Sequence, residues 1–262
     1  MTRRYGFRNR RRMLKALGND LGTTVTWNES DEQTPVGPMA DIFATTANIH
    51  KWLHYLPVYE SVVSPFRARP VRMLEIGVAR GGSLQMWRRY LDPSSIIVGV
   101  DIDPSTRQFD DPAREVHVRV GSQDDTTFLK DIITEFGPFD IILDDGSHMT
   151  SHVVNTFRFL FPHGLASGGV YIVEDISAHY WKEYRDTRMS FVDFTKWLID
   201  AMHAHYQKVN KEIDYRLDHP YRKKKIRVPL ATTLVEKVEF YDSIAAIHRA
   251  QDYRKLPRSV FR

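Results

Sequence analysis

Short apolar runs that end at glycine or acidic residues alternate with helical patterns through the middle of the chain. The runs that predict strands are Val71–Ile76, Ile96–Val100, Glu115–Val120, Phe139–Leu143 and Gly169–Val173. The segments among them that predict helices are Ser83–Leu91, Asp125–Phe136 and His152–Phe161. Because strands that alternate with helices pair in parallel, the sequence predicts an α/β fold of the doubly wound, Rossmann-like type. Ligands of such folds bind beyond the carboxyl ends of the strands, where these glycine and acidic residues stand.

Segments on both sides extend the predicted domain. Ile42–Ser64 has apolar residues at helical spacing, although we expect Pro57 to break or kink this helix. Ser190–Tyr206 predicts a long helix. Leu234–Tyr241 and Ile244–Arg249 predict two strands joined by a tight turn.

The length and composition of the chain limit its domain organisation and its class. A chain of 262 residues suits one large domain with an appendage, and 42% apolar with 27% charged residues is ordinary for a globular protein. The turn-rich stretch Asn28–Pro38 predicts a linker, so we expect an arm and linker over residues 1–38 and a domain over 39–262. Cysteine is absent, which excludes disulfides, thiolate zinc sites and Cys nucleophiles and suits a cytoplasmic location. No stretch approaches 18 apolar residues, so no spanning helix is expected.

Basic residues are concentrated at the amino end. Residues 1–15 hold seven Lys and Arg and no acid, whereas the rest holds 30 basic and 33 acidic residues, with a second basic run at Arg222–Arg227. Apolar residues between Met13 and Leu21 have helical spacing. Three interpretations of this arm stay open: a solvated or subunit-contacting tail, weak contact with an anionic membrane surface, and an organellar transit peptide. The body is mildly acidic, so no nucleic-acid partner is expected.

A glycine loop follows the first predicted strand. It begins at Glu75 and has the pattern E-x-G-x-x-x-G-G, which is neither the G-x-G-x-x-G of dinucleotide-binding folds nor the G-K-S/T of a phosphate loop. Asp101 ends the next strand, where a carboxylate can accept hydrogen bonds from ribose hydroxyls; the alternative is a plain turn residue. Gly121–Asp124, with the sequence GSQD, offers polar groups for an adenine edge, and a helix N-cap is the alternative.

Together these motifs, with LDDG after the fourth strand, resemble the class I S-adenosylmethionine-dependent methyltransferases. The carboxyl-terminal VEKVEFYDSIAAIHRA resembles that family's closing strands, which implies a seven-stranded, mostly parallel sheet with an antiparallel last strand. More narrowly, LEIGVARGGSLQMW, VGVDIDP, DDGSHM and YIVEDI resemble metal-dependent sugar O-methyltransferases of the macrocin and mycinamicin type, and also the mycobacterial enzymes of methylmannose polysaccharides. The donor-binding residues expected here are Glu75, Gly77, Gly81, Ser83, Asp101, Ser122, Gln123 and Asp144. Lys51, His54, Tyr55 and Tyr59 resemble the family's segment that covers the donor.

Acidic residues end two neighbouring strands. Four carboxylates packed together would repel one another without a cation, and hard oxygen ligands suit Mg²⁺. The resemblance implies Mg²⁺ on Asp145, Glu174 and Asp175. It also implies that His148 is the general base, a role that imidazole can fill near neutral pH, with His152 as the fallback.

The predicted function is Mg²⁺-dependent methyl transfer from S-adenosylmethionine to a hydroxyl of a sugar or glycosylated acceptor. Catechol-type methylation is the enzymatic alternative, since it uses the same metal and donor. A non-catalytic binding protein on this fold and an RNA methyltransferase are further alternatives. A homo-oligomer of two or more subunits is expected, and no role is assigned to the basic arm or to Arg222–Arg227.

Overall fold

The computed structural model describes residues 25–28, 31, 34–209 and 211–260. The chain divides into two units, Met1–Thr34 and Pro35–Arg262, and the second holds every element discussed below. The amphipathic helix predicted between Met13 and Leu21, and the basic arm with it, lie outside the described residues. The domain boundary at residue 38 stays a prediction.

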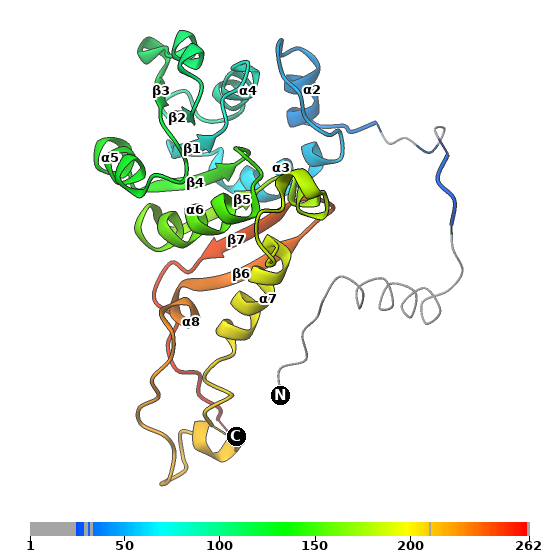
Figure 1. Ribbon diagram of the computed structural model, residues 1–262. Helices are drawn as coiled ribbons and strands as arrows, with labels where there is room; N and C mark the ends of the chain where they lie inside the picture. The colour runs from blue at the N-terminus through cyan, green and yellow to red at the C-terminus, as the bar shows by residue number, and fades with distance from the viewer. Residues whose placement is uncertain (1–24, 29–30, 32–33, 210, 261–262) are drawn as a thin grey trace. The chain divides into compact units, whose positions relative to one another are not determined.

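A seven-stranded sheet forms the centre of the second unit (Figure 1). Its strands are β1 (Arg72–Ile76), β2 (Ile96–Asp101), β3 (Val116–Val120), β4 (Phe139–Asp144), β5 (Leu165–Val173), β6 (Val235–Phe240) and β7 (Ala245–Arg249). They lie in the order β3-β2-β1-β4-β5-β7-β6, with β1 to β5 parallel and β7 antiparallel to both of its neighbours. This confirms the predicted α/β fold and its antiparallel last strand.

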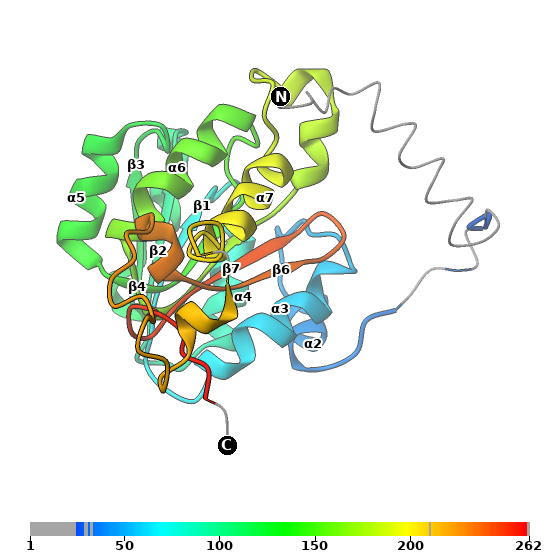
Figure 2. The ribbon, with the colours of Figure 1, turned by 90° about the horizontal axis from the view of Figure 1, so that it is seen from below.

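Helices cover both faces of the sheet (Figure 2). They are α2 (Pro38–Ala44), α3 (Tyr55–Val63), α4 (Gly82–Tyr90), α5 (Thr126–Phe136), α6 (Thr150–His163), α7 (Phe191–Met202) and α8 (Leu230–Leu234). Successive residues of β1 point to opposite faces, so that Met73 packs with α2, α3 and α4 while Leu74 packs with α5, α6 and α7. Burial on both faces explains why the parallel strands are continuous apolar runs.

Two helices differ most from their predicted extents. The segment Ile42–Ser64 is broken at residues 45–54 and not at Pro57, which lies in the first turn of α3. A proline costs little there, because the amides of a first turn have no partner within the helix. Helix α7 begins after the capping box of Ser190 and Asp193 and ends at Met202, four residues before the predicted end.

The strand order creates a crevice between β1 and β4. From β1 the chain runs outward through β2 to β3, then returns to the other side of β1 as β4 and continues to β5. Ligand sites of open α/β sheets lie at such a reversal of strand order, at the carboxyl ends. The register places Ile76 beside Asp144 and Asp144 beside Val173, so the loops after β1, β4 and β5 emerge together.

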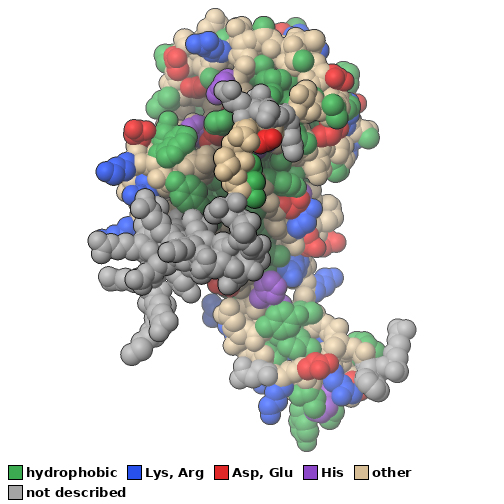
Figure 3. Space-filling view, turned by 90° about the vertical axis from the view of Figure 1, so that its right-hand side faces the viewer, with side chains coloured by type: hydrophobic (Ala, Val, Ile, Leu, Met, Phe, Trp, Pro, Cys, Tyr) green, Lys and Arg blue, Asp and Glu red, His purple; other side chains and the backbone are tan. Residues whose placement is uncertain are grey.

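Between α7 and α8 the chain leaves the sheet and pairs with the carboxyl-terminal residues, through the amide of Leu217 and the carbonyl of Ser259. This stretch includes the basic run Arg222–Arg227 and the 83% exposed Tyr221. Figure 3 shows hydrophobic and basic side chains together on the lower part of the visible face. None of the described helices has the length and apolar character needed to cross a membrane.

Candidate active site

A cavity of about 630 Å³ opens at the carboxyl ends of β1, β4 and β5. One side is formed by the glycine loop after β1 with Asp101 at the end of β2, and the other by Asp145, His148, Glu174 and Asp175. Residues 48–52 and Tyr55, which precede and begin α3, line the cavity as well. The structure therefore brings together the predicted donor loop and the predicted acidic site.

The glycine loop is held close to the acidic side of the cavity. Gly77 has a φ of +95°, and a Cβ there would lie 2.1 Å from the carbonyl oxygen of Asp145, so a larger residue does not fit. Asp101 Oδ2 accepts hydrogen bonds from the amides of Val78 (2.8 Å) and Ala79 (3.0 Å). The Asp101 carboxylate thus fixes the loop itself, a role that the sequence analysis did not include.

Glu75 lies at the base of this loop and is fully buried. Ser83 Oγ, in the first turn of α4, donates a hydrogen bond to Glu75 Oε1. Burial raises the pKa of Glu75 to about 7. Glu75 therefore ties the end of β1 to the start of α4, and Ser83 also lines the cavity.

A smaller cavity of about 170 Å³ adjoins Asp101 and contains the predicted adenine-side residues Ser122 and Gln123. Gln123 is itself bonded within the protein: its amide nitrogen lies 3.2 Å from Asp144 Oδ1, and its Oε1 accepts from the amide of Ser147 at 2.7 Å. His152 lines this smaller cavity and not the larger one. His152, the alternative base, therefore does not line the cavity that contains the acidic site.

Asp144 is buried beneath the two cavities and lines neither. Its Oδ2 accepts a hydrogen bond from the hydroxyl of Tyr171 at 3.1 Å, and Gln123 approaches the other oxygen. Burial raises the pKa of Asp144 to about 6. In the structure this carboxylate joins β4 to β5 and to the loop after β3.

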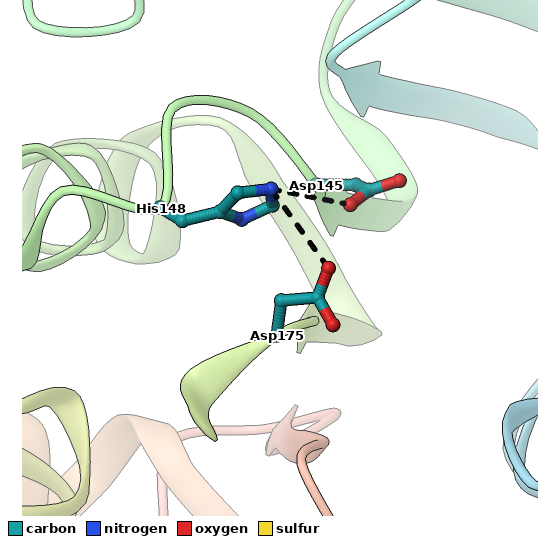
Figure 4. A group of neighbouring side chains, drawn as sticks. All are labelled: Asp145, His148 and Asp175. Carbon is teal, nitrogen blue, oxygen red and sulfur yellow. Dashed lines mark ion pairs between the residues drawn. The ribbon is translucent and has the colours of Figure 1, made fainter. Parts of the chain in front are cut away.

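His148 and the half-buried acids Asp145 and Asp175 converge on one point (Figure 4). His148 Nε2 lies 3.8 Å from Asp175 Oδ2 and 4.0 Å from Asp145 Oδ1. One ligand atom from each of Asp145, His148 and Asp175 falls within 4.8 Å of the others, a spacing that suits a metal ion. Tyr184 contacts the imidazole edge to face, with 5.9 Å between ring centroids.

Glu174 lines the same cavity but is only 2% exposed and does not belong to this group of three. Tyr59 donates a hydrogen bond to Glu174 Oε1, and Lys51 Nζ lies 2.8 Å from Glu174 Oε2. Burial raises the pKa of Glu174. Lys51 also forms a short ion pair with Asp145, so its ammonium bridges the two carboxylates.

The segment before and within α3 therefore contacts all three acids, because Tyr55 donates to Asp175 Oδ1 at 2.6 Å. Resemblance alone linked Lys51, Tyr55 and Tyr59 to the donor, and their contacts with the acids were not predicted. A signal was present for the two tyrosines: Tyr55 and Tyr59 lie four residues apart in a segment predicted to be helical, which places their hydroxyls on one face.

Backbone strain is concentrated at the same cavity. Of the six non-glycine residues with positive φ in the described chain, four line it: Asn48, Ala79, His148 and Asp175. Such conformations cost energy and persist only where the surroundings hold them. At His148 this support includes a hydrogen bond between its backbone and the buried His179.

The comparisons with known proteins agree with this geometry. Residues 74–176 match the family model described as a methyltransferase domain. The chain carries a class I methyltransferase domain. The matched residues run from β1 past Asp175, so they include the glycine loop and all four strand-end acids. The resemblance to class I methyltransferases is thereby confirmed.

Several curated relatives of this methyltransferase domain are named as O-methyltransferases of glycosylated natural products. The chain is 42% identical over 167 residues to 8-demethyl-8-alpha-L-rhamnosyl tetracenomycin-C 2'-O-methyltransferase of Streptomyces olivaceus, a match that covers 58% of this chain and 43% of the relative. It is 39% identical over 167 residues to mycinamicin VI 2''-O-methyltransferase of Micromonospora griseorubida, which covers 58% and 40%. The chain spans less than half the length of these relatives.

A solved structure with a similar fold is the MycE methyltransferase in complex with Mg, SAH and mycinamycin VI. The TM-score is 0.65 with 27% sequence identity, over 81% of this chain and 52% of that one. The likeness supports the seven-stranded methyltransferase fold derived from the strand order above.

Proposed function

We propose that this chain transfers a methyl group from S-adenosylmethionine to a hydroxyl of a sugar or glycosylated acceptor with the help of Mg²⁺. The observation that carries the proposal is the convergence of His148, Asp145 and Asp175 in the cavity that the glycine loop also lines. One cavity then holds the donor beside a base and a set of metal ligands. The named activities of the relatives support the acceptor class.

The residues present fit a magnesium ion. Carboxylate oxygens are the protein ligands that Mg²⁺ prefers, and Asp145 and Asp175 approach each other around one point. We propose Asp145, Glu174 and Asp175 as the ligands, with Glu174 adjoining Asp145 through their shared contact with Lys51. When bound, the ion would supply a Lewis acid that orients the acceptor and makes its hydroxyl more acidic.

The remaining roles fall to the chain itself. The loop from Glu75 to Ser83 and Asp101 hold the donor, with Ser122 and Gln123 on its adenine side. His148 accepts the proton of the acceptor hydroxyl. The acceptor oxygen then forms a bond to the methyl carbon as the bond from that carbon to sulfur breaks, which releases S-adenosylhomocysteine. Positioning of the two substrates and proton removal are thus the protein's contributions.

The acceptor is proposed to be a glycosylated natural product or a polysaccharide precursor. Catechol-type methylation is the second enzymatic candidate, and the aromatic rings of Trp52 and Tyr55 in the cavity wall are compatible with either acceptor. A homo-oligomeric, cytoplasmic enzyme remains part of the proposal.

The test is a screen of sugar and catechol acceptors with labelled donor, with and without a chelator. We expect methylation of a sugar hydroxyl that stops in chelator and returns with Mg²⁺. Asp145→Ala should nearly abolish turnover while S-adenosylhomocysteine still binds, and His148→Ala should lower the rate by about 10²–10⁴-fold. His152→Ala is the matched control and should remain active. Full activity in chelator would reject the metal role, and wild-type turnover in His148→Ala would reject the base.

A further inference from the structure

Lys51 places a positive charge inside the acidic site. Its side chain is 3% exposed, and its ammonium contacts one oxygen of Asp145 and one of Glu174. These two ion pairs hold the ammonium between the carboxylates of neighbouring strand ends. Lys51 is therefore part of the acidic site itself.

The formal charges of the proposed ligands and of Lys51 have a simple sum. With all three carboxylates ionised, Asp145, Glu174 and Asp175 contribute three negative charges and Lys51 one positive charge, which leaves a formal charge of −2. A divalent ion neutralises this group, whereas three carboxylates alone would match a trivalent ion. Neutrality matters here, because Glu174 and Lys51 are almost completely shielded from water.

We propose that Lys51 is a specificity-determining residue, which sets the charge of the acidic site so that it selects divalent over trivalent cations. This inference rests on the metal site of the proposed function. Lys51 could act through its charge or through the orientation of the carboxylates that it contacts. These two effects can be separated. A change in ligand orientation affects both classes of ion, whereas a change in charge affects each ion in proportion to its own charge.

The experiment measures the ratio of Tb³⁺ affinity to Mn²⁺ affinity on the full chain in phosphate-free buffer. Free Mn²⁺ is followed by electron paramagnetic resonance and bound Tb³⁺ by luminescence. Loss of one unit of positive charge from a side chain that contacts two of the proposed ligands should raise the ratio on the order of tenfold to a few hundredfold in Lys51→Met. Lys51→Arg keeps the charge and should leave the ratio within a few-fold of wild type.

Two more variants make the outcome decisive. Tyr55→Phe removes a contact with Asp175 without changing any charge, so its ratio should stay near wild type. The double variant Lys51→Met with Glu174→Gln returns the formal charge to −2 and should bring the ratio back down. If Lys51→Met does not fold, Lys51→Gln takes its place, because an amide can still donate to both carboxylates.

An unchanged ratio in the folded Lys51→Met or Lys51→Gln variant would overturn the inference. So would a double variant whose ratio stays as high as that of Lys51→Met. Failure of the proposed function looks different, because the wild-type chain would then bind neither Mn²⁺ nor Tb³⁺ at this site, or would bind them without any effect of Asp145→Ala.

Discussion

His179 should make the stability of this domain fall in mild acid. The imidazole is 1% exposed, and its Nδ1 accepts the amide of Phe191 at 3.2 Å, at the start of α7. Burial lowers the pKa of His179 from the ordinary 6.5 to about 4. Below pH 6.5 the unfolded chain therefore takes up a proton that the folded chain does not accept until near pH 4. His179 therefore has no pH-dependent effect on stability above about pH 7, and it destabilises the folded domain progressively as the pH falls toward 4.

The size of this effect follows from the shift. A difference of about 2.5 pKa units corresponds to about 3 kcal/mol in the free energy of unfolding, at roughly 1.4 kcal/mol per unit. In His179→Gln the proton uptake is lost, and the amide oxygen of glutamine can still accept from Phe191. Between pH 7 and pH 4, the free energy of unfolding of the variant should therefore fall by about 3 kcal/mol less than that of wild type.

Urea unfolding at several pH values, followed by circular dichroism, measures this difference. Other titrating groups, such as the buried Glu75 and Asp144, are common to both proteins and cancel in the comparison. His152→Gln is the control, because that ring is partly exposed at the edge of the smaller cavity. Parallel pH profiles for wild type and His179→Gln would refute the reasoning. Since His179 also contacts the backbone of His148, the same loss of stability should accompany a local loosening of the loop after β4.

Two further predictions concern the donor loop and the basic arm. Asp101→Ala should weaken S-adenosylhomocysteine by roughly 1–3 kcal/mol in calorimetry, because the amides of Val78 and Ala79 lose their acceptor along with the expected ribose contact; an unchanged affinity would assign Asp101 to the turn alone. Deletion of residues 1–30 should leave turnover on a soluble acceptor within a few-fold of the full chain, because among the described residues those that line the two cavities all follow the predicted linker; a large loss with the fold and oligomeric state intact would place the arm at the site.

The sequence predicted the sheet well because its signal is local. Each parallel strand is a short apolar run that ends at an acid or a glycine, and this pattern survives without any knowledge of partners. Five parallel strands, the closing hairpin and the antiparallel β7 all appear where predicted, with ends that shift by a few residues. β5 begins earlier than predicted, at Leu165, because glycines at 168 and 169 obscured its first half.

Contacts between distant segments could not be predicted in the same way. The sequence suggested that Gln123 and Asp101 face the donor, but the structure shows that each also holds backbone amides of the site loops. The resemblance also grouped Glu174 with Asp175 as ligands of one metal ion. Both line the cavity, but Glu174 is buried and bonded to Lys51 and Tyr59, whereas the partly exposed Asp175, with a left-handed backbone (φ +51°), approaches His148.

The residues of this site come from the matched methyltransferase domain and from the segment that precedes it. The glycine loop, the four strand-end acids and His148 all lie within residues 74–176, which match the methyltransferase model. The groups that neutralise or orient those acids, Lys51, Tyr55 and Tyr59, come from the segment that precedes it. Gly82 permits this approach, because a Cβ there would lie 2.5 Å from the backbone of Asn48. With a different amino-terminal segment, the same strand-end acids would form a site with a different net charge and would be oriented by other contacts. The chemistry available to the domain is therefore set jointly by the sheet and by the residues that cover it.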